Sequence, residues 1–137
     1  MDTNTCIFTG RLTRDAELKT VSTGLKICNF SMAFSEITKD PANPQNHIYR
    51  PNYIDCVIYG GYGEALFPIL KKGREVTITS RLHQERWQKD GKNFSRIVFY
   101  VNNLIAQREP KNQIPPINQL PQSDVNGNLD YFEPQEI

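Results

Sequence analysis

Residues 71–101 contain two strand patterns separated by one turn signal, and this stretch constrains the fold more than any other part of the chain. Residues 76–82 alternate apolar and polar side chains, which is typical of a strand with one buried face. Residues 95–105 are apolar on both faces, as in a central strand or in a strand that also contacts another subunit. Asp90 and Gly91 lie between the two runs and favour a tight turn. We therefore predict a long β-hairpin.

The only tryptophan of the chain, Trp87, lies near the tip of this predicted hairpin. If the first strand has no bulge, Trp87 shares the polar face of that strand with Arg81. Arg86, Lys89 and Lys92 surround it in the sequence. An aromatic ring among cations favours single-stranded nucleic acid, because the ring stacks on a base and the cations neutralise phosphates. The alternative is that Trp87 covers a neighbouring strand and the cations are merely solvated.

The remaining patterns indicate an all-β fold. Alternating apolar residues predict strands over residues 4–12, 26–35 and 53–59, and apolar residues at helical spacing predict a short helix over 64–70. Together with the hairpin, these elements describe a five-stranded Greek-key OB barrel with one short helix between strands 3 and 4. Barrels of this type bind oligonucleotides on the face of strands 2 and 3 and between two flanking loops.

A second aromatic surface is predicted beside the first. Residues 36–52 contain three prolines and no regular period, which predicts a long, mobile loop of the functional kind. Tyr53 and Tyr59 follow it on the polar side of a strand, where they form a possible stacking surface or simply pack at an edge. In an OB barrel, this loop and the hairpin around Trp87 flank the same face, so the three aromatic residues converge.

Charge and composition divide the chain into two parts. Residues 1–109 hold 15 Lys and Arg against 11 Asp and Glu, whereas residues 110–137 hold one Lys and four acids. The first part is the predicted OB domain that binds single-stranded nucleic acid. The second contains five prolines and eight Asn or Gln, so it buries too little apolar surface to order and is predicted to be a disordered tail. Apolar residues return among acids at 129–137, which favours a short motif for a protein partner, or else a solvated end.

Other classes of protein fit less well. Cys6, Cys28 and Cys56 lie in apolar strand runs and are read as small core residues of a protein in a reducing compartment. His47 and His83 have no Cys or carboxylate at ligand spacing, and no Gly-rich phosphate loop follows a strand. We therefore expect no metal, no cofactor and no catalysis. The sequence has no secretory apolar region and no apolar run near 18 residues, so we expect a cytoplasmic protein without a membrane contact.

Residues 3–105 resemble the bacterial single-stranded DNA-binding protein family. Each motif is weak alone, but their order and spacing together are specific. The motifs are GRLTRDAEL at 10–18, where the family usually has Gly-x-Leu-x-x-Asp-Pro-Glu, NFSMA at 29–33, VIYG at 57–60, LKKG at 70–73 before Val76 and Ile78, and Trp87 before Asp90-Gly91.

The resemblance implies an OB fold, no enzymatic activity and usually a homotetramer. It also implies sequence-tolerant binding of single-stranded DNA in replication, recombination and repair, with bases stacked on aromatics and phosphates held by cations. The predicted DNA-binding residues are Trp87, Tyr53, Tyr59, Arg86, Lys72, Lys71, Arg81, Arg11 and Lys39.

Three departures from the family pattern bear on function. Thr38 stands where the family often has another stacking tryptophan, and Ser80 replaces the usual glycine of the fourth strand. The tail lacks the dense acidic run ending in Ile-Pro-Phe through which the family recruits replication and repair proteins, so a specialised or mobile-element version is possible. The residues that could replace that tip are Asp130, Tyr131, Phe132, Glu133, Glu136 and Ile137. Two alternatives to DNA binding stay open, an RNA-binding OB module and an OB subunit that binds proteins.

Overall fold

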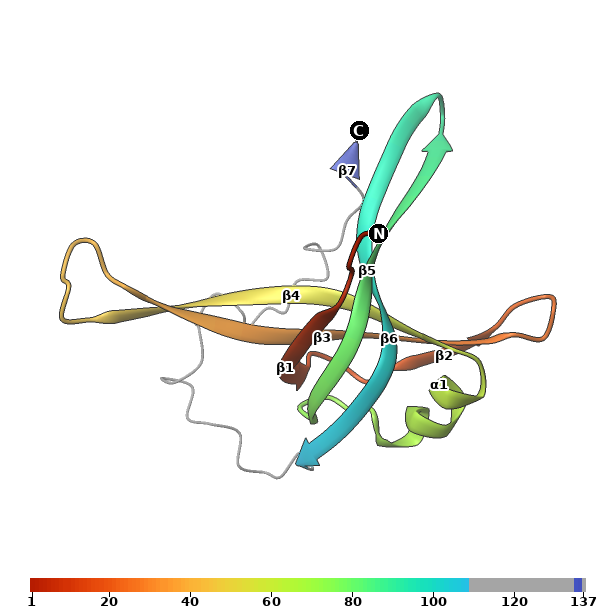
Figure 1. Ribbon diagram of the computed structural model, residues 1–137, viewed down its shortest axis with the longest axis horizontal. Helices are drawn as coiled ribbons and strands as arrows, with labels where there is room; N and C mark the ends of the chain where they lie inside the picture. The colour runs from red at the N-terminus through yellow and green to blue at the C-terminus, as the bar shows by residue number, and fades with distance from the viewer. Residues whose placement is uncertain (109–134, 137) are drawn as a thin grey trace.

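Five long strands form the body of the protein in the computed structural model, which describes residues 1–108 and 135–136 (Figure 1). A short helix and a 3-10 turn separate the third and fourth of these strands. The elements are β1 (Cys6–Leu12), β2 (Glu17–Thr20), β3 (Lys26–Lys39), β4 (His47–Tyr59), α1 (Gly60–Leu66), η1 (Phe67–Ile69), β5 (Glu75–Lys89), β6 (Lys92–Arg108) and β7 (Gln135–Glu136).

The five long strands close into a barrel. The sheet runs in the order β1-β5-β6-β4-β3, and β1 also pairs with β3, so the first and last strands meet. The closing pairs are Arg11 with Ala33 and Leu12 with Met32. β4 and β6 are parallel, and the other barrel pairings are antiparallel. The predicted five-stranded OB barrel with a helix between strands 3 and 4 is confirmed.

Gly10 allows this closure. At this point β1 leaves its pairing with β5 and approaches β3. A Cβ atom on Gly10 would lie 2.3 Å from the carbonyl oxygen of Ala33, so no larger residue fits unless the backbone moves. The close approach of the two backbones therefore requires glycine at this position.

The core consists of the inward-facing residues of every barrel strand. Phe30, Met32, Ile58, Ile78 and Leu70 are almost completely buried, and the last closes the barrel end beside η1. Val76 and Ile78 are buried on the parity expected from the sequence, whereas Leu82, on the same parity further along β5, is 39% exposed.

The three cysteines are free, and two of them belong to this core. Cys28 and Cys56 are buried and Cys6 is half-buried. Burial raises the pKa of the Cys28 thiol to about 11, and burial followed by the nearby charge of Asp55 raises the pKa of Cys56. Both thiols therefore stay protonated at neutral pH, as expected for small core residues.

Two hairpins project from the barrel. β3 and β4 pair continuously from Ile27–Tyr59 to Lys39–His47, so only residues 40–46 form a turn, and the prediction of a long mobile loop over 36–52 was wrong. Proline is tolerated here because Pro51 lies where β4 pairs only with β3 and has one free edge. The hairpin is the long horizontal ribbon of Figure 1.

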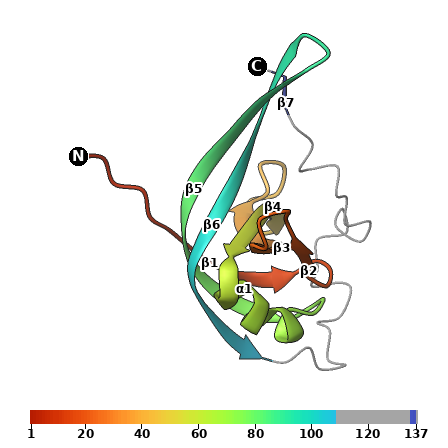
Figure 2. The same ribbon diagram turned by 90° about the vertical axis from the view of Figure 1, so that its right-hand side faces the viewer.

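The β5–β6 hairpin is the second projection, and Figure 2 shows it curving along one side of the barrel. Asp90 and Gly91 both have positive φ, 52° and 76°, as a type I′ turn requires. The β5–β6 register shifts between Thr79 and Ser80 but not beyond, so Trp87 shares a face with Arg81. The predicted hairpin, its turn and this shared face are confirmed.

The expected disorder of residues 110–137 falls almost entirely outside the described residues, as do Asp130, Tyr131, Phe132, Glu133 and Ile137 of the predicted partner motif. The boundary between residues 109 and 110 also stays a prediction. The exception is β7, whose Gln135 and Glu136 pair with Ser95 and Phe94 of β6.

Candidate nucleic-acid interface

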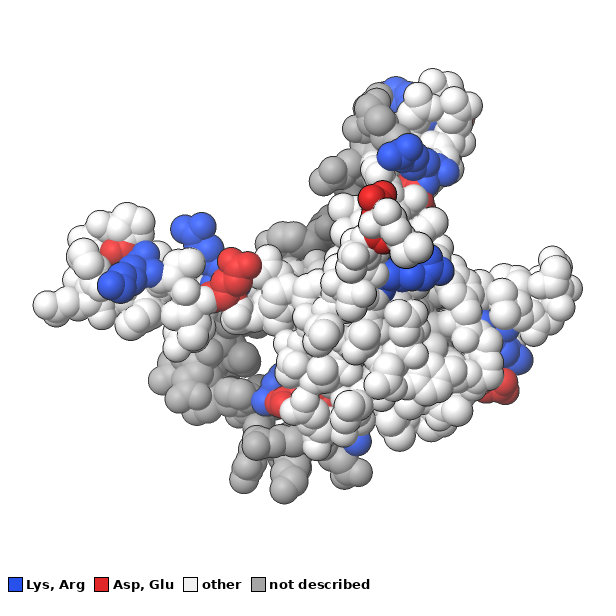
Figure 3. All heavy atoms as spheres, in the orientation of Figure 1, with Lys and Arg blue, Asp and Glu red and all other residues white. Residues whose placement is uncertain are grey.

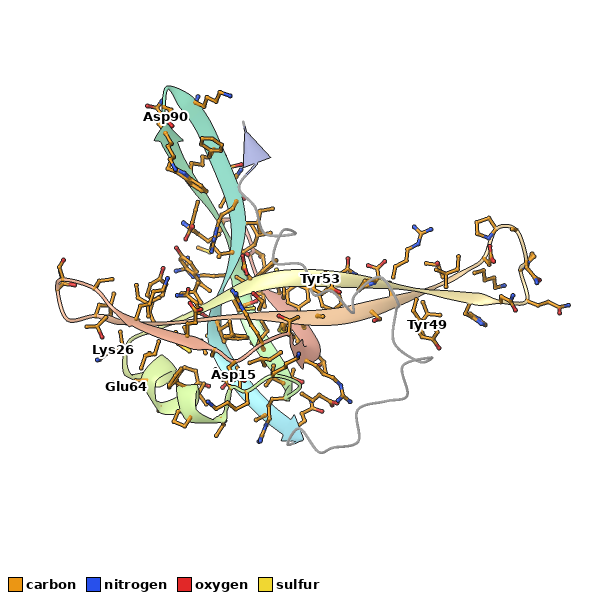
Figure 4. The ribbon with its side chains drawn as sticks, turned by 180° about the vertical axis from the view of Figure 1, so that it is seen from behind. Asp15, Lys26, Tyr49, Tyr53, Glu64 and Asp90 are labelled. Carbon is orange, nitrogen blue, oxygen red and sulfur yellow. The ribbon has the colours of Figure 1, made fainter. Side chains whose placement is uncertain are left out.

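The outer face of β4 carries the residues on which the candidate site is built. Ile54, Cys56 and Ile58 point into the barrel, so the alternate residues point outward. The outward set is Tyr53, Asp55, Val57 and Tyr59. Tyr53 lies where β4 passes the base of the β5–β6 hairpin, and Asp90 marks the tip of that hairpin (Figure 4). One outer surface thus continues from β4 onto β6 and β5.

Four side chains form an aromatic and cationic cluster on this surface, here named the Tyr100 cluster. The rings of His83 and Tyr100 are stacked, with centroids 4.5 Å apart and an interplanar angle of 22°. Tyr59 contacts Tyr100 edge to face at 5.2 Å. The guanidinium carbon of Arg81 lies 4.8 Å from the centroid of the Tyr100 ring, within the range of a cation–π contact. β4, β5 and β6 therefore each contribute to one platform suited to a base and its phosphate.

Tyr59 remains uncharged over a wide pH range. Burial, followed by the hydrogen bond and charge interaction with Tyr100, raises the pKa of Tyr59 to about 12. Its folded-state pKa thus lies above the ordinary tyrosine value of about 10. The resulting stability is fully present below that ordinary value and is lost as pH rises through the folded value.

A spectroscopic titration checks this value. We expect the absorbance at 295 nm of wild-type protein, minus that of Tyr59→Phe, to show one phenol ionising well above pH 10. Circular dichroism over the same range verifies that both proteins stay folded. If the phenol that Tyr59→Phe removes ionises near pH 10 in the wild-type protein, Tyr59 is not held against Tyr100 as described.

Trp87 lies further along the same face of β5. It is half-buried and pairs across the hairpin with Phe94, with ring centroids 6.0 Å apart and an interplanar angle of 21°. The tryptophan therefore has one aromatic neighbour in its own hairpin and does not belong to the barrel core. Trp87 packs on Phe94 of the neighbouring strand and stays partly accessible, and its stacking on a DNA base stays a prediction.

A polar network occupies the same face between the two tyrosines of β4. The Ser31 hydroxyl donates a 2.8 Å hydrogen bond to Oδ1 of Asp55, and Arg96 lies 3.8 Å from Oδ2. Arg96 also contacts Glu85 at 3.2 Å. Burial raises the pKa of Asp55, and the Ser31 hydrogen bond and the charges of Arg96 and Arg14 oppose that rise. Asp55 is thus a half-buried carboxylate with a fixed orientation.

Two valines lie beneath this network. Val57 and Val98 are 4% and 0% exposed, although both are on outer-face positions and outside the main core cluster. The surrounding polar and aromatic side chains cover them. The face is consequently a packed surface that can hold its side chains in fixed positions.

The predicted cations separate into two groups. Arg81 joins the Tyr100 cluster, Arg86 lies on the opposite face of β5 from Trp87 and contacts Gln84, and Lys39 ends β3 on the other hairpin. Figure 3 shows Lys and Arg on both projecting hairpins, whereas the front of the barrel between them is largely uncharged.

Arg11, Lys71 and Lys72 form the second group, at the opposite end of β5 from Trp87. Arg11 lies 3.5 Å from Glu75. Lys71 lies 3.9 Å from Asp15, which also accepts a hydrogen bond from the backbone N–H of Lys72. The structure does not bring these three cations to the Tyr100 cluster, and whether they contact DNA stays a prediction.

The family model described as "Single-strand binding protein family" matches residues 3–107, which covers both hairpins and the barrel. The chain belongs to the single-strand binding protein family. The family is one of binding proteins, as the sequence resemblance implied.

Two curated relatives of this single-strand binding protein family member come from spirochaetes. The single-stranded DNA-binding protein of Treponema pallidum is 35% identical over 103 residues, which cover 75% of this chain and 57% of the relative. That of Borreliella burgdorferi is 35% identical over 127 residues, which cover 91% and 80%. The match thus spans little more than half of the Treponema protein.

Solved structures share the fold. The Plasmodium falciparum SSB complex with ssDNA has a TM-score of 0.71 and 22% identity, covering 79% of this chain and 97% of that one. A deletion mutant of the Thermus aquaticus single-stranded DNA binding protein has a TM-score of 0.69 and 22% identity, covering 77% and 51%.

Sequence reasoning missed three residues at the site. Tyr100 was read only as part of an apolar strand, Phe94 was given no role, and His83 was set aside as a histidine without ligand partners. A usable signal existed, because His83 has the same parity as Arg81 and Trp87. Tyr100 required the β5–β6 register, which the sequence does not show.

Within residues 1–108 and 135–136, no three His, Cys, Asp or Glu side chains are grouped to hold a metal ion. No helix in the same residues is both long and apolar enough to span a bilayer.

Proposed function

We propose that this protein binds single-stranded DNA on the outer face of β4, β6 and β5, largely without sequence preference. The observation that carries this function is the Tyr100 cluster, in which Tyr59, Tyr100 and His83 join the Arg81 guanidinium on one surface. Stacked bases contribute roughly 1–3 kcal/mol each, and every base has a face that stacks. The two relatives named above carry the name single-stranded DNA-binding protein, which supports the same function.

The role that follows is non-enzymatic. A protein of this kind protects exposed single strands during replication, recombination and repair, and works in the cytoplasm at the nucleoid. Tyr53 extends the stacking surface along β4 and Trp87 extends it along β5, and Arg86 and Lys39 add cations on the two hairpins. Arg11, Lys71 and Lys72 would contact DNA only if the DNA strand continues past the end of β5 that lies away from Trp87.

Competition between matched DNA and RNA oligomers tests this function at low and high salt. We expect tighter binding to oligo-dT than to oligo-U, and weaker binding of both as salt rises, because bound cations release counterions. Equal or tighter binding of RNA would favour an RNA-binding module. Absence of binding to both oligomers, at low and at high salt, would favour an OB subunit that binds proteins.

Assembly into a homotetramer is part of the proposal. The outer surface of β1, β5 and β6 carries exposed Ile7 and Ile105 beside hydrogen-bonded Thr9 and Thr77, without charge among these residues. Within the described residues, β1 pairs with β3 only at Arg11 and Leu12, so the rest of that edge is open to another strand. Light scattering of the full chain measures the assembly, and a monomer at working concentrations would contradict it.

The tail is proposed to compete with DNA for this face and to recruit replication and repair proteins. Residues 110–137 carry four acids and one Lys, opposite in sign to residues 1–109. The backbone of Gln135 and Glu136 pairs with Ser95 and Phe94, and Phe94 stacks on Trp87. The chain end thus lies beside the stacking surface.

Removing the tail tests this competition. We expect a chain ending at Glu109 to bind oligo-dT more tightly than the full chain at low salt, because it lacks the competing acidic segment. The difference should disappear at high salt, where exposed charges are screened. A full-length control with Asp124, Asp130, Glu133 and Glu136 changed to Asn or Gln should match the truncated chain. Identical affinities of the full and truncated chains at low salt would refute the competition.

A further inference from the structure

A polar cavity lies on the same outer face, between β2, β3, β4 and β6, and the stacking surface does not include it. Its volume is about 280 Å³. That is slightly below the range of about 300–1,000 Å³ typical for sites of drug-sized molecules, so it suits one small planar group. On β4 the cavity residue Asp55 lies between Tyr53 and Tyr59, the two tyrosines of the stacking surface.

The cavity contains both signs of charge. Arg14, Lys19 and Arg96 line it together with the carboxylates of Asp55 and Glu17. The Asp55 side chain is only 13% exposed and the Arg96 side chain 32%. Charged side chains of both signs exclude an apolar ligand, and the little-exposed Asp55 carboxylate disfavours an anion placed directly beside it. The cavity therefore fits a neutral group that presents donors and acceptors together.

Asp55 has unused acceptor capacity. An ionised carboxylate accepts about four hydrogen bonds. In the structure, Oδ1 accepts one from Ser31 at 2.8 Å and Oδ2 faces Arg96 at 3.8 Å. These two partners hold the carboxylate in place and leave lone pairs for a ligand with N–H groups. Arg96, itself held at 3.2 Å by Glu85, presents guanidinium donors beside it.

Guanine matches this pair better than the other DNA bases. Its N1–H and N2–H₂ groups are adjacent donors that one carboxylate accepts together, and its O6 is an acceptor beside them for a guanidinium. Thymine has one N–H between two carbonyls, and adenine and cytosine each offer a single amino group. A base that leaves a buried polar group unpaired is disfavoured.

We propose that this cavity, here named the Asp55 cavity, receives the Watson–Crick edge of one base of bound DNA and favours guanine. The proposal rests on the DNA-binding function and adds one selective position to a binder that is otherwise sequence-tolerant. Stacking on the Tyr100 cluster supplies the affinity, and the Asp55 cavity reads one base of the strand that passes over β4.

Inosine provides the sharpest test, because its base differs from guanine only by lacking the N2 amino group. The probes are thymine oligomers of equal length with isolated guanines or with inosines at the same positions, so that no guanine run can form a quadruplex. We expect the full chain to bind the guanine oligomer about tenfold more tightly than the inosine oligomer. Asp55→Asn should bring this ratio close to one.

Glu64→Gln is the matched control, because Glu64 is exposed on α1 and does not line the cavity; its ratio should equal that of wild type. Equal affinity of wild type for the two oligomers, with tight binding of oligo-dT, would overturn the cavity proposal alone. Failure to bind any oligomer would overturn the proposed function instead. The wild-type ratio needs no variant, so a poorly folded Asp55→Asn protein would not prevent a decision.

Discussion

Changing Trp87 to alanine should weaken binding of oligo-dT about 5- to 150-fold at moderate salt, the equivalent of one stacked base at roughly 1–3 kcal/mol. Trp87 lies on the outer face of β5 in line with Arg81 and outside the barrel core, so its removal takes away a stacking surface and leaves the barrel intact. Fluorescence anisotropy of a labelled oligomer measures the affinity.

Trp87→Phe is the control for this variant. It keeps an aromatic ring opposite Phe94 and should retain most of the affinity for oligo-dT. If the substitutions acted only by disrupting the hairpin, the affinity of each variant would instead follow its thermal stability. Thermal unfolding of each protein separates the two causes. If Trp87→Ala binds oligo-dT as tightly as wild type, Trp87 does not contact bases and the site is restricted to the Tyr100 cluster.

Gly10→Ala should lower the free energy of unfolding by at least about 1–3 kcal/mol, the usual range for overpacking a well-filled site. The added Cβ would lie 2.3 Å from a backbone oxygen of β3, and that atom cannot rotate away as a side chain would. Relief requires β1 and β3 to separate where the barrel closes. Urea unfolding followed by circular dichroism measures the loss.

Gly61→Ala is the opposite case in the same protein. Gly61 is exposed in α1, and an added Cβ would meet nothing within 4 Å. Alanine in a helix is more favourable than glycine by about 1 kcal/mol, so this variant should be as stable as wild type or more stable. Equal stability of Gly10→Ala and wild type would mean that β1 does not approach β3 as closely as described.

Much of the fold follows from local pattern. Residues 76–82 alternate except at Ser80, and Asp90-Gly91 specifies the turn. The face of Trp87 was therefore predictable, because the hairpin has no bulge between Arg81 and its tip. The helix began earlier than predicted, at Gly60, because Gly63 packs its backbone against Ile58 and apolar spacing alone does not reveal that contact. Pro68 falls in the 3-10 turn that follows α1.

Features that depend on pairing between distant strands were not predictable. Residues 36–39 and 47–52 show no clear alternation and the second segment contains Pro51, yet both belong to the paired strands of the β3–β4 hairpin. Tyr100 meets Arg81 only because the β5–β6 register shifts at Thr79/Ser80, which no local pattern shows. Asp55 and Arg96 lie 41 positions apart in the sequence, on β4 and β6, so their contact depends on the pairing of distant strands in the barrel.

Intrinsic fluorescence during titration with oligo-dT, at low and at high salt, tests the central claim most directly, because Trp87 is the only tryptophan and needs no label. The claim predicts quenching that saturates with oligomer and weakens as salt rises, since a base stacks on the indole and cations hold the phosphates. An unchanged signal, in a protein that another method shows to bind the same oligomer, would place the DNA away from the β5–β6 hairpin. An unchanged signal without any binding would contradict the DNA-binding function itself.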